Sequence, residues 1–352
     1  MGKYDVILGN EGEKHFLLGN EAIVRGLIES GVGIATTYPG TPSSEIGDVL
    51  SNIAKDIGIY FEYSTNEKVA LEVAAASAAS GIRSFVFMKH VGLNVASDAF
   101  MSISFTGTKA GLVIMTGDDP SMFSSQNEQD NRNYAEFAYV PLIEPSNPQE
   151  AKDFLVYAFN LSEKYEKPVL FRTTTRVSHQ RANVVYGKKR EITKIGKFEK
   201  NPDRFVLLPS NAYRAKNEVI KKLEDLKKES EISPLNVEIN NNSEYGIITS
   251  GATYNYIMDA FNMLNIKLDI LKLGFSYPPP YQKIENFIKR HNEILVAEEV
   301  DPFIEKHVRI VAQIKNINVP IHGKFDGYVE FSYEQNPDRI VKSISKLLNI
   351  EY

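Results

Sequence analysis

Hydrophobic and polar positions in the first half of the chain follow two repeats in turn. Short runs of apolar residues, as in buried strands, alternate with longer stretches in which apolar residues recur every three or four positions, as in amphipathic helices. The expected strands lie at 32–38, 59–63, 83–88, 110–115 and 168–172, and the expected helices at 21–31, 44–54, 68–80, 94–105 and 148–164. Apolar strands that alternate with helices are typical of a parallel sheet covered on both faces. The first half therefore predicts an α/β fold.

The pattern changes between residues 186 and 243, where Lys, Glu and Asn are frequent and one charged helix is expected at 213–228. Strand–helix alternation then returns in a smaller unit. Its expected strands lie at 246–251, 268–273 and 293–299, and its expected helices at 253–264, 281–291 and 337–348. We therefore expect an α/β domain at 1–185, a connector with a charged helix at 186–243, and a second α/β domain at 244–352.

Composition excludes several classes of function. A formal net charge of −5 and a pI near 5.8 argue against a nucleic-acid surface. The chain has no cysteine, which excludes disulfides, thiol nucleophiles and cysteine-ligated iron–sulfur clusters within it. No stretch approaches the roughly 18 apolar residues of a membrane span, and residues 1–5 carry no apolar leader. We expect a cytoplasmic protein with no membrane segment.

One acidic residue, Glu67, stands where the apolar strand at 59–63 becomes an alanine-rich helix. This junction lies at the carboxyl edge of the predicted parallel sheet, which is where α/β folds bind ligands. The partial positive charge at the start of the helix favours a carboxylate there. A charged carboxylate in a crevice can polarise the ring nitrogen of a bound heterocycle, which is the chemistry that thiamine diphosphate requires of a protein. Glu67 is therefore the first candidate catalytic residue.

Two further turns are expected at the same edge. In the sequence Y-P-G-T-P-S-S at 38–44, Thr41 suits a helix N-cap and Pro42 the first helical position, which would leave backbone N–H groups free for a carboxylate or phosphate. A capped helix start without a ligand explains the same spacing. In the loop at 89–94, His90 can donate to an anion or transfer a proton, or it can have neither role.

A long polar loop at 117–132 and two arginines complete the set of candidates. The loop follows an apolar strand and predicts an interface or a lid, because its ligand spacing fits no calcium loop and favours no metal site. Arg172 and Arg176 end the last strand of the first domain. They can clamp a carboxylate, pair across an interface, or form a salt bridge to the connector.

Five motifs, taken together and in order, resemble the large (alpha) subunit of the indolepyruvate:ferredoxin oxidoreductases. That family belongs to the thiamine-dependent 2-oxoacid:ferredoxin oxidoreductases. The motifs are Y-P-G-T-P-S-S at 38–44, N-E-K-V-A at 66–70, K-H-V-G-L-N at 89–94, G-D-D-P-S-M with S-S-Q-N-E-Q-D at 117–130, and F-R-T-T-T-R at 171–176. The similarity covers essentially the whole chain.

The resemblance implies a fold and a set of site residues. It implies a pyrimidine-binding (PYR) domain of thiamine enzymes with a parallel sheet, followed by a transketolase C-terminal-like α/β domain. Glu67 matches the glutamate that hydrogen-bonds N1′ of the aminopyrimidine, as a catalytic and cofactor-binding residue. Thr41 and Pro42 match the turn beside the substrate, and the cofactor-binding set is completed by His90, Gly92 and Asn94.

The resemblance also implies an activity that needs other polypeptides. The expected reaction is the oxidative decarboxylation of a 2-oxo acid, such as indolepyruvate or another aryl pyruvate, to an acyl-CoA with thiamine diphosphate. The family's pyrophosphate-binding G-D-G and Asn-Asn motifs and its cluster cysteines have no counterpart here, and Phe123 stands where a histidine is expected. The chain is thus expected to be the front part of the subunit, inactive alone and without a metal site.

The expected partners follow from those missing parts. They are a pyrophosphate-binding domain or subunit with Mg²⁺, a ferredoxin-like domain with [4Fe–4S] clusters, a small (beta) subunit, ferredoxin and coenzyme A, in a dimer of hetero-oligomers. Two other hypotheses remain. One is a non-catalytic scaffold or regulatory subunit with the same fold. The other is an unrelated α/β nucleotide-binding protein, which predicts a G-x-G-x-x-G after the first strand that the sequence lacks.

Overall fold

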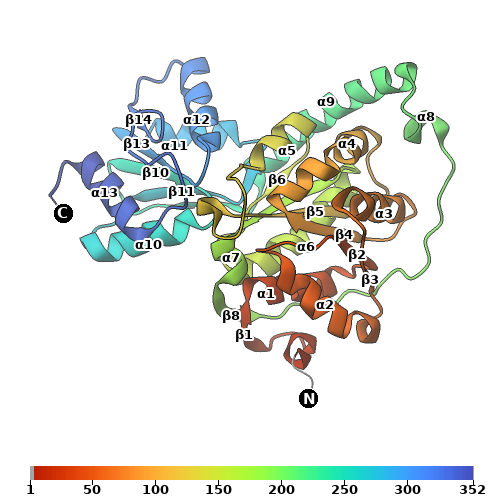
Figure 1. Ribbon diagram of the computed structural model, residues 1–352. Coiled ribbons are helices and arrows are strands. Elements are labelled where there is room, and N and C mark those ends of the chain that lie inside the picture. Colours follow the sequence, from red (N-terminus) through yellow and green to blue (C-terminus); the bar gives the residue numbers. More distant parts are fainter. Residues whose placement is uncertain (1–3, 352) are drawn as a thin grey trace.

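The computed structural model describes residues 4–351, which form two α/β units (Figure 1). The first unit is built on a seven-stranded sheet in the order β12-β6-β7-β5-β4-β2-β3, in which β12 is antiparallel to β6 and the remaining pairs are parallel. Its strands are β2 Ile34–Thr37, β3 Tyr60–Tyr63, β4 Ser84–Lys89, β5 Leu112–Asp118, β6 Leu142–Ile143, β7 Val169–Thr174 and β12 Phe275–Tyr277. Its helices are α1 Gly19–Ser30, α2 Ser44–Ile57, α3 Glu67–Ala79, α4 His90–Thr106, α5 Arg132–Ala138, α6 Pro148–Tyr165 and α7 Thr175–His179.

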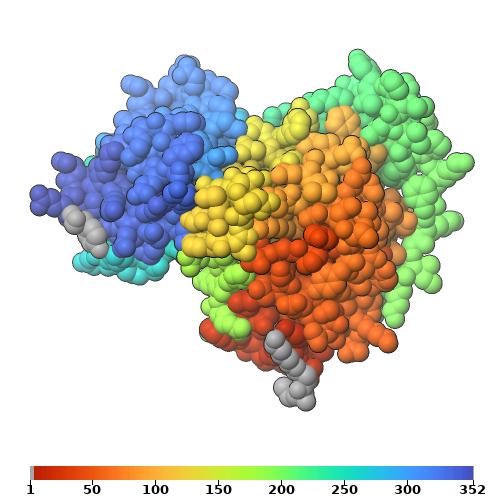
Figure 2. All heavy atoms as spheres, viewed as in Figure 1, coloured from red at the N-terminus to blue at the C-terminus, as the bar shows by residue number. Residues whose placement is uncertain are grey.

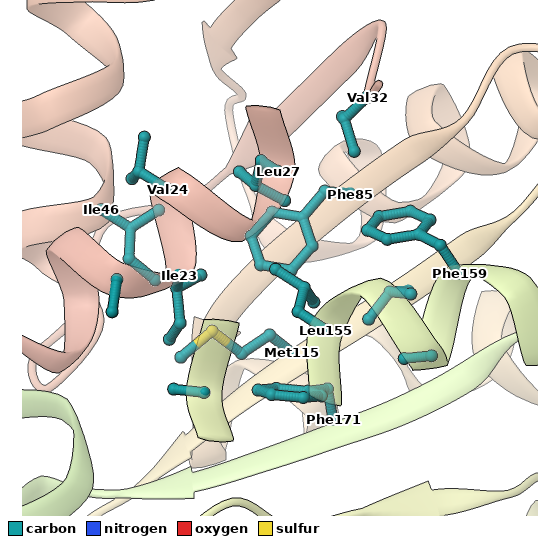
Figure 3. Close-up of a cluster of buried hydrophobic side chains, with 14 of the residues drawn as sticks. Ile23, Val24, Leu27, Val32, Ile46, Phe85, Met115, Leu155, Phe159 and Phe171 are labelled. Carbon is teal, nitrogen blue, oxygen red and sulfur yellow. The ribbon is translucent and has the colours of Figure 1, made fainter. Parts of the chain in front are cut away.

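Successive residues of the central strands point to opposite faces of this sheet, because the side-chain period of a strand is two. In β4, Phe85 and Phe87 join the apolar cluster beneath α1, α2 and α6, whereas Val86 and Met88 join the cluster beneath α3 and α4. Figure 3 shows the first cluster, where side chains from strands and helices interdigitate: Ile23, Leu27, Phe85, Met115, Leu155 and Phe171. The predicted parallel sheet, buried on both faces, is confirmed.

The second unit holds a five-stranded sheet in the order β14-β13-β10-β11-β9, in which β9 is antiparallel to β11. Its strands are β9 Asn236–Ile239, β10 Tyr245–Thr249, β11 Asp269–Leu273, β13 Glu293–Ala297 and β14 Ile321–His322. Its helices are α10 Thr253–Leu264, α11 Tyr281–Ile288, α12 Phe303–Ile314 and α13 Pro337–Leu348. Helices α10 and α13 cover one face. The cluster beneath α11 and α12 on the other face is continuous with the core of the first unit, which ties the two units together.

Several elements of the structure differ from the expectation. Strand β9 lies before residue 244 yet belongs to the second sheet, and β12 lies after residue 244 yet pairs with β6 of the first sheet. Both are edge strands that adjoin another strand in the sequence with no helix between them, so the strand–helix alternation does not mark them. Helix α12 was not expected at all. The two sheets therefore exchange chain segments across the expected boundary.

The remaining segments lie at the periphery. A two-stranded antiparallel ladder pairs β1 Lys14–Leu18 with β8 Arg181–Val185, and two short 3-10 helices occur at Asp5–Leu8 and Pro120–Met122. The segment that carries α8 Pro202–Phe205 and α9 Pro209–Ile232 runs around the outside of the first unit (Figure 1). None of the helices within residues 4–351 has the length and apolar character needed to cross a bilayer. Residues 1–3, part of the segment without an apolar leader, lie outside the described residues.

Candidate functional site

The carboxyl ends of β2, β3, β4 and β5 are neighbours in the sheet, so the turns that follow them share one edge, called the site edge below. These turns approach one another closely. A Cβ atom at Gly40 would lie 2.8 Å from Cβ of Lys89, and a Cβ at Gly117 would lie 3.0 Å from Cγ of Pro42. Such spacing leaves no room for a side chain at either glycine. The structure thus brings together the motifs that the sequence assigned to this edge.

Glu67 is the first residue of α3 and lies at the site edge. The preceding Asn66 caps the helix, since its Oδ1 accepts a hydrogen bond of 2.9 Å from the backbone N–H of Val69. The Glu67 side chain is half-buried. Within residues 4–351, no donor lies within hydrogen-bonding distance of its carboxylate. The helix start therefore presents a carboxyl group at the site edge that no side chain or backbone donor within residues 4–351 pairs with.

Gly92 packs directly against Glu67. It is buried in the first turn of α4, and a Cβ atom there would lie 2.7 Å from both Cγ and Oε1 of Glu67. A side chain at position 92 would displace the carboxylate. Two of the predicted cofactor-binding residues are therefore in contact, and the glycine defines where the Glu67 side chain lies.

The turn at 38–44 differs from its predicted form. Helix α2 has Ser43, not Thr41, at its N-cap, and the N–H of Ser43 donates to the carbonyl oxygen of Gly40 at 3.0 Å. The expectation that Thr41 caps the helix and that this N–H is free is wrong, because the turn closes on itself before the helix begins. Thr41 is half-buried and Pro42 is buried. Pro42 contacts Gly117 of the long loop.

Two residues that the sequence did not single out support this turn. The side-chain amide of Asn20 donates to the carbonyl of Pro42 and to the Glu45 carboxylate, both at 2.7 Å. Nε2 of His179 lies 3.3 Å from Oε1 of Glu45, and this pairing raises the pKa of His179. Burial alone would raise the pKa of Glu45, but its bonds to His179 and Asn20 lower it. Neither residue belongs to a motif with recognisable spacing.

The segment at 89–94 is the first turn of α4 rather than a loop. His90, the first helical residue, is 0% exposed, and its Nε2 lies 3.2 Å from two oxygens of Asn127. In this structure His90 has no surface with which to contact a ligand, so its predicted place in the cofactor set is not supported. Asn94 is exposed and shares hydrogen bonds of 3.0 Å with Gln129.

The loop at 117–132 lies between the two units. Its yellow spheres fill the space between the red and orange first unit and the dark blue second unit in Figure 2. Ser121 Oγ accepts a hydrogen bond of 2.9 Å from the N–H of Glu334, and Glu128 accepts one of 3.3 Å from the N–H of Tyr333. Of the two predicted roles, an interface describes this loop better than a lid.

Arg172 and Arg176 are both already paired. Arg172 is buried and donates to Asp118 at 2.6 Å and to Glu144 at 2.8 Å, all within the first unit. Arg176 donates from Nε to Glu334 of the second unit at 2.8 Å. The interface hypothesis is therefore correct for Arg176, and the salt bridge to the connector is found for neither residue. Among residues 4–351, no group of three or more histidine or acidic side chains is arranged to hold a metal ion.

With this geometry known, comparison with other proteins identifies the family. Residues 25–232 match the family described as pyruvate flavodoxin/ferredoxin oxidoreductase, thiamine diphosphate-binding. The chain belongs to this family. The match spans the site edge, including Glu67 and Gly92, and most of the seven-stranded sheet. It confirms the predicted relationship to the thiamine-dependent 2-oxoacid:ferredoxin oxidoreductases.

Individual relatives agree. The chain is 54% identical over 349 residues to the indolepyruvate oxidoreductase subunit IorA of Methanothermobacter marburgensis, an alignment that covers 99% of this chain and 56% of that protein. The chain thus spans little more than half the length of this curated relative.

Two solved structures share the fold. The 2-oxoglutarate:ferredoxin oxidoreductase of Magnetococcus marinus superposes with a TM-score of 0.73 at 15% identity, covering 96% of this chain and 65% of that one. A split-gene transketolase, solved as an inactive beta4 tetramer, superposes with a TM-score of 0.59 at 13% identity and covers 96% of this chain and 100% of that one. These likenesses confirm the predicted fold class, in which a thiamine-enzyme domain is followed by a second α/β domain.

Proposed function

We propose that this chain supplies the aminopyrimidine side of a thiamine diphosphate site in an oxidoreductase that decarboxylates 2-oxo acids and passes the electrons to ferredoxin. One observation carries the proposal. The Glu67 carboxylate lies at the site edge of a family member, packs against a glycine, and has no partner among residues 4–351. A carboxylate that has no partner and stands at a helix start, on the edge of a parallel sheet where α/β folds bind ligands, favours a functional role.

The residues at this edge fit the cofactor. A carboxylate without a partner can accept or share a proton at one atom of a heterocycle, and the lack of a side chain at Gly92 lets the Glu67 carboxylate occupy its place at this edge. When bound, thiamine diphosphate supplies the electron sink for the decarboxylation of 2-oxo acids. Glu67 would hold a proton at its carboxylate oxygen and orient the ring. Thr41 and Pro42, next to the long loop, would lie on the substrate side.

Other polypeptides complete the proposed enzyme. We infer that the pyrophosphate and Mg²⁺ are held by a pyrophosphate-binding domain or subunit, and that [4Fe–4S] clusters on a ferredoxin-like domain accept the electrons. A small (beta) subunit, ferredoxin and coenzyme A complete the reaction, which yields an acyl-CoA. The name shared by relatives 45–54% identical to this chain favours indolepyruvate or another aryl 2-oxo acid as the substrate. Their designation as a subunit supports a multi-subunit assembly.

The test is an isosteric change at Glu67 in the assembled complex. Glu67→Gln keeps the size of the side chain but removes its charge, so we expect kcat for 2-oxo-acid-dependent dye reduction to fall by at least about 10²-fold. The matched control is Glu72→Gln, which lies on the exposed side of the same helix and should leave the rate unchanged. Size-exclusion chromatography establishes that both variants assemble.

The same experiment separates the proposed function from the scaffold hypothesis. An assembled Glu67→Gln complex that keeps the wild-type rate would mean that the carboxylate takes no part in catalysis, and the chain would then be a structural or regulatory subunit. A large loss in Glu67→Gln with a normal rate in Glu72→Gln supports the catalytic assignment.

A further inference from the structure

Gln129, near the end of the long loop, has a side chain that links several parts of the site edge. Its amide nitrogen lies within hydrogen-bonding distance of three acceptors for its two N–H groups: the backbone carbonyl of His90 at 3.1 Å, Oδ1 of Asn94 at 3.0 Å and Oδ1 of Asn131 at 2.9 Å. Its amide oxygen accepts a hydrogen bond of 3.0 Å from Asn94. Gln129 is half-buried, so these bonds are partly shielded from water.

Two of these acceptors belong to the first turn of α4. His90 and Asn94 bracket Gly92, the residue whose backbone lies against the Glu67 side chain. Asn131 adds a second donor to the same His90 carbonyl, at 3.0 Å. The backbone around Gly92 is thus fixed from the side of the long loop, whereas Glu67 itself has no hydrogen bond that fixes it.

The end of the long loop is in turn anchored to the second unit. Arg132, 1% exposed, donates to Glu298 at 2.7 Å and to the carbonyl oxygens of Glu299 and Asp301 at 2.7 and 2.9 Å. Glu298 also accepts the N–H groups of Ile304 and Glu305 at the start of α12, so the guanidinium is fastened to a rigid helix end. Gln129 and Asn131 are close neighbours of this anchor in the sequence.

We propose that Gln129 is a positioning residue for Glu67. Its hydrogen bonds hold the first turn of α4, which contains Gly92, against the Glu67 side chain. Arg132 fixes the end of the long loop to the second unit, so the second unit determines where Gln129 lies. This inference rests on the proposed function, because it gives the second α/β unit a task in the reaction: to set the location of a carboxylate that it does not touch.

The test replaces Gln129 by methionine in the assembled complex. Gln129→Met keeps the length of the side chain and removes all its hydrogen bonds. We expect kcat to fall by about tenfold to a hundredfold with the KM for the 2-oxo acid unchanged, because a small displacement of a catalytic group has effects of that size. The matched control is Gln126→Met, in the same loop at an exposed position, which should behave as wild type.

Two further readouts exclude a merely structural effect. Hydrogen exchange at residues 90–94 in the assembled complex should speed up in Gln129→Met but not in Gln126→Met. In the Glu67→Gln background, Gln129→Met should cost no additional rate, because a residue that acts through Glu67 has nothing left to position.

The outcomes distinguish this inference from the proposed function. If Glu67→Gln slows the enzyme but Gln129→Met leaves kcat and exchange unchanged, or adds its full loss to that of Glu67→Gln, the positioning role is wrong while the function stands. A wild-type rate in Glu67→Gln overturns the proposed function itself.

Discussion

Two sets of charged residues in this molecule differ in one respect, which is whether each charge has a partner. In the seam between the two units, Arg132 is held by Asp130 at 2.5 Å and Glu298 at 2.7 Å. Arg172, which lies 3.8 Å from Asp130, is held by Asp118 at 2.6 Å within the first unit, and all of these side chains are buried. At the site edge, Glu67 is half-buried and has no partner among residues 4–351.

The difference distinguishes charges that hold the two units together from a carboxylate that is available to a ligand. Burying a charge is costly unless it is paired, so the charges in the seam must satisfy one another for the two units to pack. The pKa of Asp130 shows this balance. Burial raises the pKa of this carboxyl, but the charges of Arg132 and Arg172 outweigh burial and bring the pKa down to about 2. Glu67 does not need such a partner, because its side chain is partly exposed to water and lies at the partially positive N-terminus of α3. It is therefore free to interact with a ligand.

Breaking the seam should give the largest change in stability. Arg132→Leu leaves the buried carboxylate of Glu298 without its arginine and that of Asp130 with Arg172 alone, 3.8 Å away, and we expect the free energy of unfolding to fall by about 3–5 kcal/mol. Urea unfolding of the full chain measures this loss. The control is Arg181→Leu, whose side chain is 52% exposed and lies 3.7 Å from Glu21, and which should cost at most about 0.5 kcal/mol. Equal losses in both variants would show that the seam is no more important than a surface ion pair.

The sequence predicts the site edge better than the seam, for a physical reason. The position of Glu67 follows from a local pattern, an apolar strand that runs into an alanine-rich helix, and so does its place at the carboxyl end of a parallel sheet. The pairing of Arg132 with Glu298 spans 166 residues and depends on how the two units dock. No spacing along the chain records such a contact, and the same holds for Asn20 beneath Pro42.

Helix propensity also gives the wrong prediction where tertiary contacts outweigh it, as at residues 89–94. The glycine and asparagine in 89–94 argue against a helix, because both residues have low helix propensity. The structure nevertheless begins α4 at His90, where Gly92 packs against Glu67 and the bonds from Gln129 and Asn131 hold that turn.

Glu299 is the exception within the seam and provides a sharper test of the comparison. It is buried, its Oε1 has no hydrogen-bond partner among residues 4–351, and burial raises its pKa to about 7 although Arg172 opposes the shift. The folded state then keeps a proton that the unfolded chain loses near pH 4.5. The contribution of Glu299 to the free energy of unfolding is therefore fully present below about pH 4.5. This contribution, up to about 3 kcal/mol, is lost as the pH rises towards 7.

Glu299→Gln removes this titration and should flatten that part of the pH dependence. We expect the free energy of unfolding of wild type, relative to Glu299→Gln, to fall between pH 5 and pH 7, and urea unfolding at both pH values measures the difference. A constant difference between the two proteins over this range would mean that Glu299 is ionised throughout and paired as the other seam charges are.

The smallest expected effect comes from Gly92→Ala. This substitution distinguishes the site edge from the seam, because we expect it to change the rate and not the stability. Alanine is the better helix former by up to about 1 kcal/mol, so this gain offsets the contact that its methyl group makes with Glu67 and the stability of the chain should change little. That methyl group would approach Cγ and Oε1 of Glu67 to 2.7 Å, so the carboxylate must move. We expect kcat in the assembled complex to fall by about tenfold, the lower end of the effect of misplacing a catalytic group. Ser97→Ala, one turn further along α4, is the control and should leave both quantities unchanged. A loss of stability without a loss of rate would reverse the assignment, because Gly92 would then serve packing, as the seam does, and not the position of Glu67.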